Sequence, residues 1–418
     1  MINQETKDIY EIGEHPPLGF IPNKMYAQTI RKDRFGEPLK SMKCEVVDVP
    51  DIDDDECLVL VMAAGINYNN IWAGLGKPVD VIKARKTSGG GDHDFHIGGS
   101  DASGIVYKIG ANVDNIKVGD KVVLHCGTWS KDAADIKSGI DPILSTSNRI
   151  WGYETNFGGF AQFTKVQAHQ VVPKPKQLSW EEAASYMLVG ATAYRMLHNF
   201  FPNNVKKNDV VFVWGGSGGV GCQAIQLAKL AGARPIAVIS DDSYTEHCLK
   251  LGAQGVINRK QYSHWGNIPD PSDSKSYSRW LAGVRKFRKQ IWKILGERKN
   301  PDIVIEHPGE STLPTSAYIV ERGGMVVTCG ATTGYIGTLD IRYHWMHQKR
   351  FQGSHFANDE QARKLNDLYR EDKLEACLNK VFTFHDIPKA HQVMYENSHT
   401  AGNMAALVSA IDTNMGRE

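Results

Sequence analysis

The pattern of apolar and polar positions divides the chain into regions of different character. From residue 25 to about 172, apolar residues form short runs separated by turns, as at 43–49, 56–63 and 121–125, without long helical patterns. This spacing is typical of a barrel-like β domain. From about residue 180 onward, apolar runs alternate with amphipathic stretches, and glycines stand at the joints. This alternation predicts a doubly wound parallel sheet covered by helices on both faces.

The strands of the second region are short and rich in β-branched residues. We expect them at residues 210–214, 235–240, 255–258, 302–306 and 324–329. Helices are expected at 220–231 and 244–251, and Gly232 ends the first of them because glycine adopts a positive φ at little cost. The region is therefore predicted to be a Rossmann domain.

A glycine-rich stretch follows the first of these strands. Gly216, Gly218 and Gly221 fit the pattern G-x-G-x-x-G between a strand and a helix. The first glycine makes the tight turn, the second lets a pyrophosphate approach the backbone, and the third lets helix and strand pack closely. The stretch predicts a dinucleotide site made by Gly216, Ser217, Gly218, Gly219, Val220 and Gly221.

The segments on either side of the Rossmann domain are predicted to form one other domain. Ser179 and Glu182 form a capping box that opens a helix running through residues 191–194. After the Rossmann strands, residues 350–356 are predicted to be a strand and 359–370 a helix. We therefore expect a first domain of residues 1–194 and 350–418, with a Rossmann domain of 195–349 inserted in it.

Composition excludes several classes of protein. The 418 residues include 48 basic and 47 acidic side chains, so no global charge favours nucleic acid or a membrane surface. No apolar run has the length of a transmembrane helix, and the N-terminus does not resemble a signal peptide. Seven scattered cysteines without a C-x-x-C pair indicate a reduced, cytoplasmic protein. A basic helix at 280–299 is either a solvated face or an anion contact.

Seven collinear motifs carry a specific resemblance. They lie at residues 65–72, 99–104, 149–158, 191–195, 212–215, 306–309 and 353–358. In these motifs the chain resembles the crotonyl-CoA carboxylase/reductases of the medium-chain dehydrogenase/reductase superfamily. The resemblance implies an α/β fold with a GroES-like β-barrel catalytic domain, NADPH as cofactor, and an acyl-CoA and CO2 as substrates. It also implies a homotetramer arranged as a dimer of dimers.

The zinc alcohol dehydrogenases belong to the same superfamily, so a metal site has to be considered. Where those enzymes have a cysteine ligand this chain has Asn67, and where they have a Gly-His-Glu turn it has Gly-Ser-Asp at 99–101. It also lacks their four-cysteine lobe. Without these ligands we expect no metal.

The resemblance assigns four residues to the chemistry. Asn69 would donate its amide N–H to CO2 as the carboxylate forms, and His355, expected on the strand at 350–356, would bond a CO2 oxygen. Glu154 would orient that histidine, and Tyr153 stands where many relatives have Phe. The alternatives are a structural asparagine (with Asn67 as the second choice for the amide), a structural histidine, and a surface ion pair for Glu154.

The cofactor and substrate contacts are also expectations. Asp241 lies 20 residues after Gly221, where an acid usually binds a ribose hydroxyl and favours NAD. The resemblance favours NADPH, with Ser240 and Arg259 (or Lys260) near the 2′-phosphate. Tyr318 and Arg342 match family positions near the CoA moiety.

Three functions are compatible with these motifs. The first is reductive carboxylation of a short-chain enoyl-CoA, converting crotonyl-CoA and CO2 to ethylmalonyl-CoA. An enoyl-CoA reductase without carboxylation would share every motif. A non-catalytic NADPH-binding protein would not need Asn69, Glu154 and His355 together.

Overall fold

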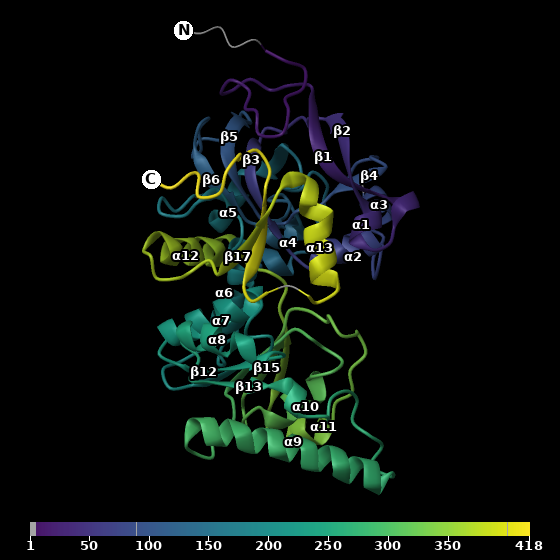
Figure 1. Ribbon diagram of the computed structural model, residues 1–418, viewed down its shortest axis with the longest axis vertical. Coiled ribbons are helices and arrows are strands. Elements are labelled where there is room, and N and C mark those ends of the chain that lie inside the picture. The colour runs from purple at the N-terminus through teal and green to yellow at the C-terminus, as the bar shows by residue number, and fades with distance from the viewer. Residues whose placement is uncertain (1–5, 89, 399) are drawn as a thin grey trace. The chain divides into compact units, whose positions relative to one another are not determined.

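The computed structural model describes residues 6–418 except 89 and 399, and it divides into two compact units. The β unit consists of the residues up to Leu188 together with Ala357–Glu418, and the Rossmann unit is Val189–Phe356 (Figure 1). The divisions fall at 188/189 and 356/357, against expected boundaries at 194/195 and 349/350. Among the described residues, no helix has the length and hydrophobicity needed to span a membrane.

The β unit is built on a long buried strand, β3 (Glu56–Ile66), which pairs with strands from both ends of the chain. On one side, β5 (Ala102–Ile109), β6 (Lys121–Leu124) and β10 (Val171–Pro173) follow in order. On the other side lie β18 (Asn403–Leu407) and β17 (Leu378–Phe382), and β9 (Phe163–Gln167) also pairs with β3. The C-terminal segment thus completes the first domain, which confirms the predicted insertion of the Rossmann domain.

The remaining elements of the β unit are short. A three-stranded sheet has the order β2 (Met42–Asp48), β1 (Lys24–Arg31), β4 (Phe95–Ile97), and β7 (Gly127–Thr128) pairs with β8 (Arg149–Ile150). The α-helices are α1 (Pro38–Ser41), α2 (Asn69–Leu75), α3 (Val81–Thr87), α4 (Ala134–Lys137), α5 (Trp180–Ala183), α12 (Asp359–Arg370) and α13 (Ile387–Tyr395). The 3-10 helices are η1 (Lys32–Arg34), η2 (Pro142–Leu144), η3 (Ala168–Gln170) and η6 (Phe384–Asp386).

The Rossmann unit contains a six-stranded sheet in which every neighbouring pair is parallel. The order is β13 (Gly255–Asn258), β12 (Arg234–Ile239), β11 (Val210–Val213), β14 (Ile303–Glu306), β15 (Met325–Thr328), β16 (Arg350–Gly353). The helices of this unit are α7 (Gly219–Leu230), α8 (Thr245–Lys250), α9 (Ser274–Leu295), α10 (Leu313–Ile319) and α11 (Ile341–Met346), with η4 (Asp242–Tyr244) and η5 (Arg259–Gln261). The order reverses between β11 and β14, so their carboxyl ends flank the position where such folds bind dinucleotides.

Two sequence predictions are corrected here. The strand expected at 350–356 ends at Gly353 and is the sixth strand of the Rossmann sheet, paired with β15, rather than part of the β domain. The helix opened by Ser179 ends at Ala183, although its capping box forms as predicted. A second helix, α6 (Met187–His198), then begins two residues before the division between the units.

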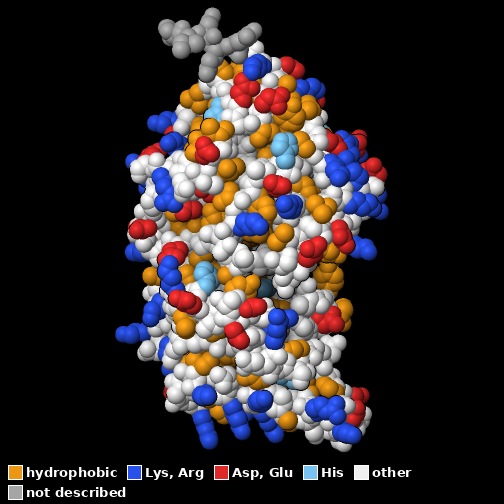
Figure 2. Space-filling view, viewed as in Figure 1, with side chains coloured by type: hydrophobic (Ala, Val, Ile, Leu, Met, Phe, Trp, Pro, Cys, Tyr) orange, Lys and Arg blue, Asp and Glu red, His pale blue; other side chains and the backbone are white. Residues whose placement is uncertain are grey.

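The long basic helix α9 packs one apolar face on the Rossmann core. Trp280, Val284, Phe287, Ile291 and Leu295 are buried there. Part of its charge is stacked on aromatic rings, since the Arg288 guanidinium lies 4.7 Å from the Trp292 ring centroid and 5.0 Å from that of Tyr318. Lys and Arg side chains project along the lower edge of the space-filling view, where α9 lies (Figure 2). The solvated-face interpretation therefore accounts for the helix.

Candidate functional site

Asn69 lies in the first turn of α2 and is held in one orientation by its neighbours. The Gly99 N–H donates to Asn70 Oδ1 (2.9 Å), so the Nδ2 of that amide must donate to Asn69 Oδ1 (2.9 Å). One N–H of the Asn69 amide then donates to Ser100 Oγ (2.8 Å). This relay leaves the second N–H of the half-buried Asn69 amide without a partner among the described residues, so it is available to an acceptor. Asn69 and Asn70 with residues 98–101 are called the asparagine corner below.

The turn at 99–101 does not suit a zinc ion. Asp101 is fully buried and accepts the Leu188 N–H (3.2 Å) and a hydrogen bond from Asn67. Burial nevertheless raises the pKa of Asp101 well above its usual value. An amide, a hydroxyl and a neutral carboxyl are poor zinc donors compared with thiolate and imidazole. The residues at this corner therefore do not fit the metal site of the zinc alcohol dehydrogenases.

Tyr153 and Glu154 lie in a turn that packs on the same corner. Gly159 N–H donates to Gly99 O (2.8 Å), and a Cβ on Gly152 would lie 2.1 Å from that oxygen, so only glycine fits there. Glu154 Oε2 accepts the Ile150 N–H (2.8 Å), which closes its own turn. The carboxylate makes no ion pair among the described residues, so the surface ion pair considered for it is absent from this part of the chain. Tyr153 is half-buried.

His355 lies in the Rossmann unit, two residues after β16, and its side chain is exposed. It is therefore in a loop, not on a strand as predicted. Ser354 N–H donates to Thr328 O (2.8 Å) and fixes the backbone just before it. No hydrogen bond of the imidazole is found among the described residues. A lone exposed imidazole in a connecting loop can meet a ligand without first losing an internal partner.

The glycine turn takes the shape that the sequence predicts, with one change. Gly215 is the residue in the left-handed region (φ 56°), not Gly216, whose Cβ position lies 2.6 Å from Ala237 Cβ on the neighbouring strand. A Cβ on Gly221 would lie 2.1 Å from Gly215 O, so this glycine allows the helix to pack on the strand. At Gly218 the nearest atom would be 3.4 Å away, which leaves room beside the N-terminus of α7. Ser217, Gly219 and Val220 complete this turn and the first turn of α7.

The carboxyl ends of β12 and β13 carry the residues expected to select the cofactor. Asp241 Oδ1 accepts the Ser243 N–H (3.0 Å), so this carboxylate caps η4. The backbone N–H and the hydroxyl of Ser243, together with the charge of Lys260, hold the pKa of Asp241 below its usual value. Ser240 is half-buried at the tip of β12, and Arg259 is half-buried at the start of η5.

Tyr318 and Arg342 are not placed alike. The Tyr318 ring is buried and contacts Trp280 and Tyr343 edge-on, so it belongs to the core of the Rossmann unit. Arg342 is exposed, and its guanidinium forms two hydrogen bonds to Asp340 (2.9 and 2.6 Å). It lines a cavity of about 420 Å³ with Ile268, Pro269, Asp270, Thr338 and Leu339. A phosphate ligand would have to share this guanidinium with Asp340.

A buried carboxyl that the sequence predictions missed lies at the end of β14. Burial raises the pKa of Glu306 to about 7, against the opposing effect of bonds from Ser316 (2.5 Å) and Thr312 (2.7 Å). The Trp214 indole N–H donates to the same Ser316 hydroxyl (2.8 Å). Glu306 thus ties β11 and β14 together at the point where the strand order reverses. A charged residue ending an otherwise apolar buried strand was the available signal.

Two supporting residues of the asparagine corner were also missed. Asn70 is fully buried, and Ser100 is the acceptor that orients Asn69. The only sequence signal was that Asn70 is next to Asn69 and that Ser100 lies in the 99–104 motif. That signal predicts neither the direction of their hydrogen bonds nor their burial.

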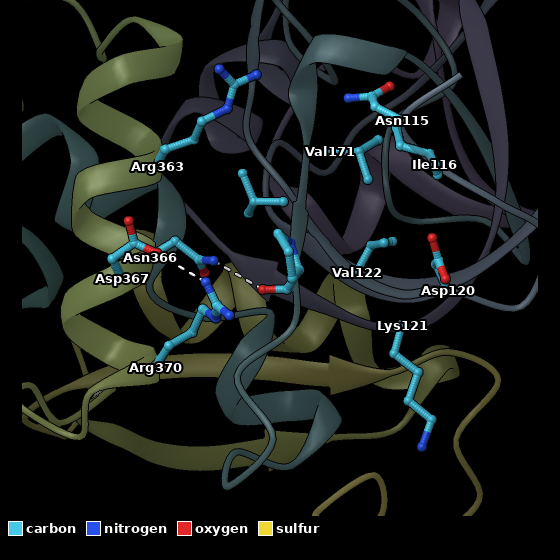
Figure 3. Close-up of a pocket in the computed structure, with 12 residues that line it drawn as sticks. Asn115, Ile116, Asp120, Lys121, Val122, Val171, Arg363, Asn366, Asp367 and Arg370 are labelled. Atoms are coloured by element: carbon cyan, nitrogen blue, oxygen red, sulfur yellow. Dashed lines mark hydrogen bonds and ion pairs between the residues drawn. The ribbon is translucent and has the colours of Figure 1, made fainter. Parts of the chain in front are cut away.

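A separate pocket lies elsewhere in the β unit. It has a volume of about 620 Å³ between α12 and the edge formed by β6 and β10, and none of the predicted catalytic residues lines it. Figure 3 shows Arg363 and Arg370 reaching from α12, with Asn366 bonded to the Pro173 carbonyl (2.9 Å). Arg370 is paired with Asp367 (3.1 Å), and the pocket is open and contains both signs of charge.

Two family models match the chain. The alcohol dehydrogenase GroES-like domain matches residues 53–176, and the zinc-binding dehydrogenase model matches residues 219–371. Together they span the β unit and the Rossmann unit in the order that the fold requires. The second model carries zinc in its description, whereas the corner at Asn67 and 99–101 lacks suitable donors.

Individual relatives match nearly the whole chain. A crotonyl-CoA carboxylase/reductase of Cereibacter sphaeroides is 53% identical over 98% of this chain and 93% of its own length. A crotonyl-CoA reductase of Streptomyces avermitilis is 37% identical, covering 95% and 91%. Among solved structures, the crotonyl-CoA carboxylase/reductase AntE in complex with NADP is 48% identical, with a TM-score of 0.93 over 97% of this chain and all of that chain. The 2-octenoyl-CoA carboxylase reductase CinF, in complex with NADP and 2-octenoyl-CoA, is 35% identical, with a TM-score of 0.87 over 95% and 90%.

Proposed function

Because this chain belongs to the crotonyl-CoA carboxylase/reductase family, we propose that it catalyses the NADPH-dependent reductive carboxylation of a short-chain enoyl-CoA. Bound NADPH would supply a hydride to the β-carbon of the enoyl thioester. The electron pair of the double bond moves onto the thioester oxygen, and the α-carbon of this enolate forms a new bond to CO2. With crotonyl-CoA the product is ethylmalonyl-CoA, and with a proton in place of CO2 it is the saturated acyl-CoA.

The observation that carries this proposal is the oriented Asn69 amide. Its carbonyl oxygen is engaged by Asn70 and one N–H by Ser100, so the remaining N–H has a fixed direction. A prearranged donor of this kind stabilises negative charge where it develops, here on a CO2 oxygen, without reorganising during the reaction. Asn70 acts through Asn69 as a positioning residue.

His355 and Glu154 take the other roles in this proposal. The imidazole of His355 is exposed and has no hydrogen bond within the described part of the chain, and it bonds the second CO2 oxygen, directly or through a water. Glu154 uses Oε2 to close its own turn, and its Oε1 is left to orient that water or the imidazole. Tyr153, beside it, contributes a hydroxyl that a phenylalanine would lack.

The proposed cofactor is NADPH rather than NADH. Asp241 is the residue that would favour NAD, but one of its carboxylate oxygens already accepts the Ser243 N–H. Ser240 and Arg259 would hold the 2′-phosphate, since a guanidinium suits phosphate geometry. The pyrophosphate would lie against the open side of Gly218, at the N-terminus of α7.

The runner-up function is reduction without carboxylation, and Tyr153 is the observation that favours it. A half-buried phenol next to Glu154 can deliver a proton to the enolate. The proton and CO2 would then compete for the same α-carbon.

We also propose that the protein works as a homo-oligomer in the cytoplasm, as a tetramer by family analogy. The outer edge of β16 is unpaired in the described chain, and Phe351 on it is exposed, as are Phe201, Ile341 and Trp345 elsewhere in the Rossmann unit. A strand edge with exposed apolar side chains is suited to a second copy. Light scattering after size-exclusion chromatography measures the assembly, and a monomer at micromolar concentration would contradict this part.

The deciding experiment is NADPH oxidation with crotonyl-CoA, with and without bicarbonate, and with products identified by mass. Ethylmalonyl-CoA formation is expected with bicarbonate and butyryl-CoA without it. Butyryl-CoA under both conditions would favour the runner-up. Bound NADPH without turnover of any enoyl-CoA would contradict both enzyme functions.

A further inference from the structure

A cluster of two histidines and one carboxylate lies in the β unit, outside the residues that the proposed function uses. His125 follows the end of β6 and is fully buried, His169 lies in η3, and Asp359 is the first residue of α12. Asp359 Oδ1 lies 3.0 Å from His125 Nε2 and 2.9 Å from His169 Nδ1. Three segments distant in sequence therefore meet at one carboxylate oxygen.

The hydrogen-bond directions around His169 require a proton on each of its ring nitrogens. The Gln167 amide is fixed by the backbone of Trp129, because its Nε2 donates to Trp129 O (3.1 Å) and its Oε1 accepts the Trp129 N–H (3.1 Å). His169 Nε2 faces that acceptor oxygen at 2.8 Å, and Nδ1 faces the Asp359 carboxylate. Only the imidazolium donates to both acceptors. The Trp129 indole stacks on this ring with centroids 4.4 Å apart, which suits a cation.

His125 and Asp359 complete the charge assignment. His125 Nδ1 accepts the Gly127 N–H (3.3 Å), so its Nε2 carries the proton and donates to Asp359. Against the opposing effect of burial, bonds from both histidines hold the pKa of Asp359 well below its usual range. The same tautomer argues against a metal, because His125 Nε2 has no lone pair to offer in this arrangement. The cluster is therefore a site for a proton, with one imidazolium, one carboxylate and one neutral imidazole.

Asp359 lies close to His355 in the sequence, so the cluster holds the chain near that histidine. It lies four residues after His355 and three after the second division between the units, at 356/357. The neighbouring Asn358 donates to Asp141 Oδ1 (3.1 Å) and caps α12 with Gln361. Asn366, two turns further on, is bonded to Pro173 O and to the Tyr186 hydroxyl. The β unit thus holds α12 at its start and along its length, and the chain enters it directly from the loop that carries His355.

We propose that Asp359, clamped between His125 and protonated His169, is a positioning residue for His355 and thereby favours carboxylation over protonation of the enolate. The inference rests on the proposed function, in which His355 bonds CO2. The two bonds from the imidazole rings hold the carboxylate oxygen, and with it the first residue of α12, in one place. Among the described residues, the titratable groups facing His169 are Asp359 from α12 and His125 from the end of β6. The clamp therefore fixes the start of α12 by two bonds to one carboxylate oxygen.

The first test is hydrogen exchange of the full-length protein, because it does not depend on turnover. Asp359→Asn keeps the size of the side chain but removes the charge that holds both rings. Amides at 354–361 should exchange roughly tenfold faster, because a buried bonded partner has been lost. The matched control is Glu360→Gln, which removes one charge from the next residue of the same helix turn, where Glu360 is exposed and pairs only with Lys364 in the described chain. Equal exchange in the two variants would overturn the clamp.

The second test is the product ratio with crotonyl-CoA at constant dissolved CO2. Asp359→Asn should lower the ratio of ethylmalonyl-CoA to butyryl-CoA roughly tenfold, with NADPH oxidation within about twofold of the unmutated enzyme. If Asp359→Asn exchanges faster but keeps the product ratio, Asp359 only anchors the fold, and the positioning role is overturned.

Two further measurements keep the proposal testable if Asp359→Asn does not fold. In the unmutated protein, ¹⁵N shifts should show a proton on both ring nitrogens of His169, as its two acceptors require. A neutral His169, or stoichiometric zinc bound to the cluster, would overturn it. His355→Ala distinguishes failure of the proposed function from failure of the clamp. An unchanged product ratio in this variant contradicts the proposed role of His355. The hydrogen-exchange measurements test the clamp independently of that result.

Discussion

The glycine turn of the Rossmann unit and the asparagine corner of the β unit both depend on glycines, but for different reasons. In the glycine turn, the atom that excludes a side chain at Gly221 is Gly215 O, six residues earlier. In the corner, the atom that excludes one at Gly152 is Gly99 O, from a segment 53 residues away in the sequence. The first site is made by local backbone geometry that binds through N–H groups. The second is made by side chains that several segments hold in place.

This difference has a consequence for mutation. A change in the glycine turn should damage its own backbone and the binding of cofactor, and leave the fate of the enolate alone. A change in the corner should leave cofactor binding alone and alter the product. The predictions below use this contrast, beginning with the largest expected effect.

Asn69→Leu should shift the product from ethylmalonyl-CoA to butyryl-CoA. It removes the oriented N–H at nearly constant volume, and losing one such donor costs about 2.7–4 kcal/mol of transition-state stabilisation. NADPH oxidation should survive, because the glycine turn is untouched. The product ratio in saturating bicarbonate measures the effect. If both products fall equally, Asn69 serves the fold and the contrast between the two regions fails.

Glu306→Gln should remove a pH dependence from the stability of the protein. Burial raises the folded-state pKa of Glu306 to about 7 from an ordinary value of 4.5, so folding favours the protonated carboxyl. Its favourable contribution is complete below about pH 4.5 and is lost as pH rises through 7. At about 1.4 kcal/mol per pKa unit, the full loss is roughly 3–4 kcal/mol. Denaturant unfolding between pH 5 and 8 measures it, and equal slopes for both proteins would contradict the burial argument.

Gly221→Ala and Gly218→Ala should separate folding from binding within the glycine turn. The methyl group on Gly221 meets Gly215 O at 2.1 Å, so this variant should lose about 1–3 kcal/mol of stability along with NADPH affinity. The methyl group on Gly218 meets nothing closer than 3.4 Å, so that variant should keep its stability and lose only affinity. Thermal unfolding and NADPH titration measure the two quantities. If both variants lose the same stability, the space available for a methyl group does not distinguish Gly221 from Gly218.

Arg259→Ser should lower the preference for NADPH over NADH by roughly tenfold, the value of one charge-assisted contact to the 2′-phosphate. The comparison of kcat/KM for the two cofactors tests it. Asp241→Ser is the matched variant, and it should change the preference less, because that carboxylate caps η4. If the cofactor preference changes only in Asp241→Ser, then Asp241, and not Arg259, contacts the ribose of the cofactor.

Tyr153→Phe should have the smallest effect, raising the carboxylated fraction about twofold by removing one proton source beside the corner. The measurement is the product ratio at limiting bicarbonate. A fall in the carboxylated fraction would mean that the hydroxyl holds CO2 or its water instead.

The sequence predicted the elements whose causes are local. The strand at 255–258, the helix at 359–370, the capping box at Ser179 and the end of α7 before Gly232 were all found, because each depends on residues a few positions apart. The wrong predictions concern segments whose structure depends on pairing with a distant strand. Residues 350–356 were predicted to be one strand, but only Arg350–Gly353 pair with β15, and this places His355 in a loop.

The candidate site divides in the same way. Gly216–Gly221 could be assigned from spacing, since the same residues form the turn and would meet the phosphates. Tyr318 and Arg342 could not be assigned so, because only the packed core shows that the tyrosine ring is enclosed by Trp280 and Tyr343, and only the turn before α11 shows that the guanidinium is engaged by Asp340. The catalytic assignments of Asn69, Tyr153, Glu154 and His355 stay predictions.

By itself, then, the sequence determined the order of domains, the nucleotide turn and the family, because each is written in patterns over short distances or in motifs read one by one. Only the tertiary structure decided which atoms are already occupied. Among the residues that the structure describes, it left one N–H of Asn69 without a partner, made the Asp241 carboxylate a helix cap and buried Glu306. It also brought His125, His169 and Asp359 to one point. Hydrogen-bond direction and burial depend on neighbours that are distant in the chain, and no local pattern specifies them.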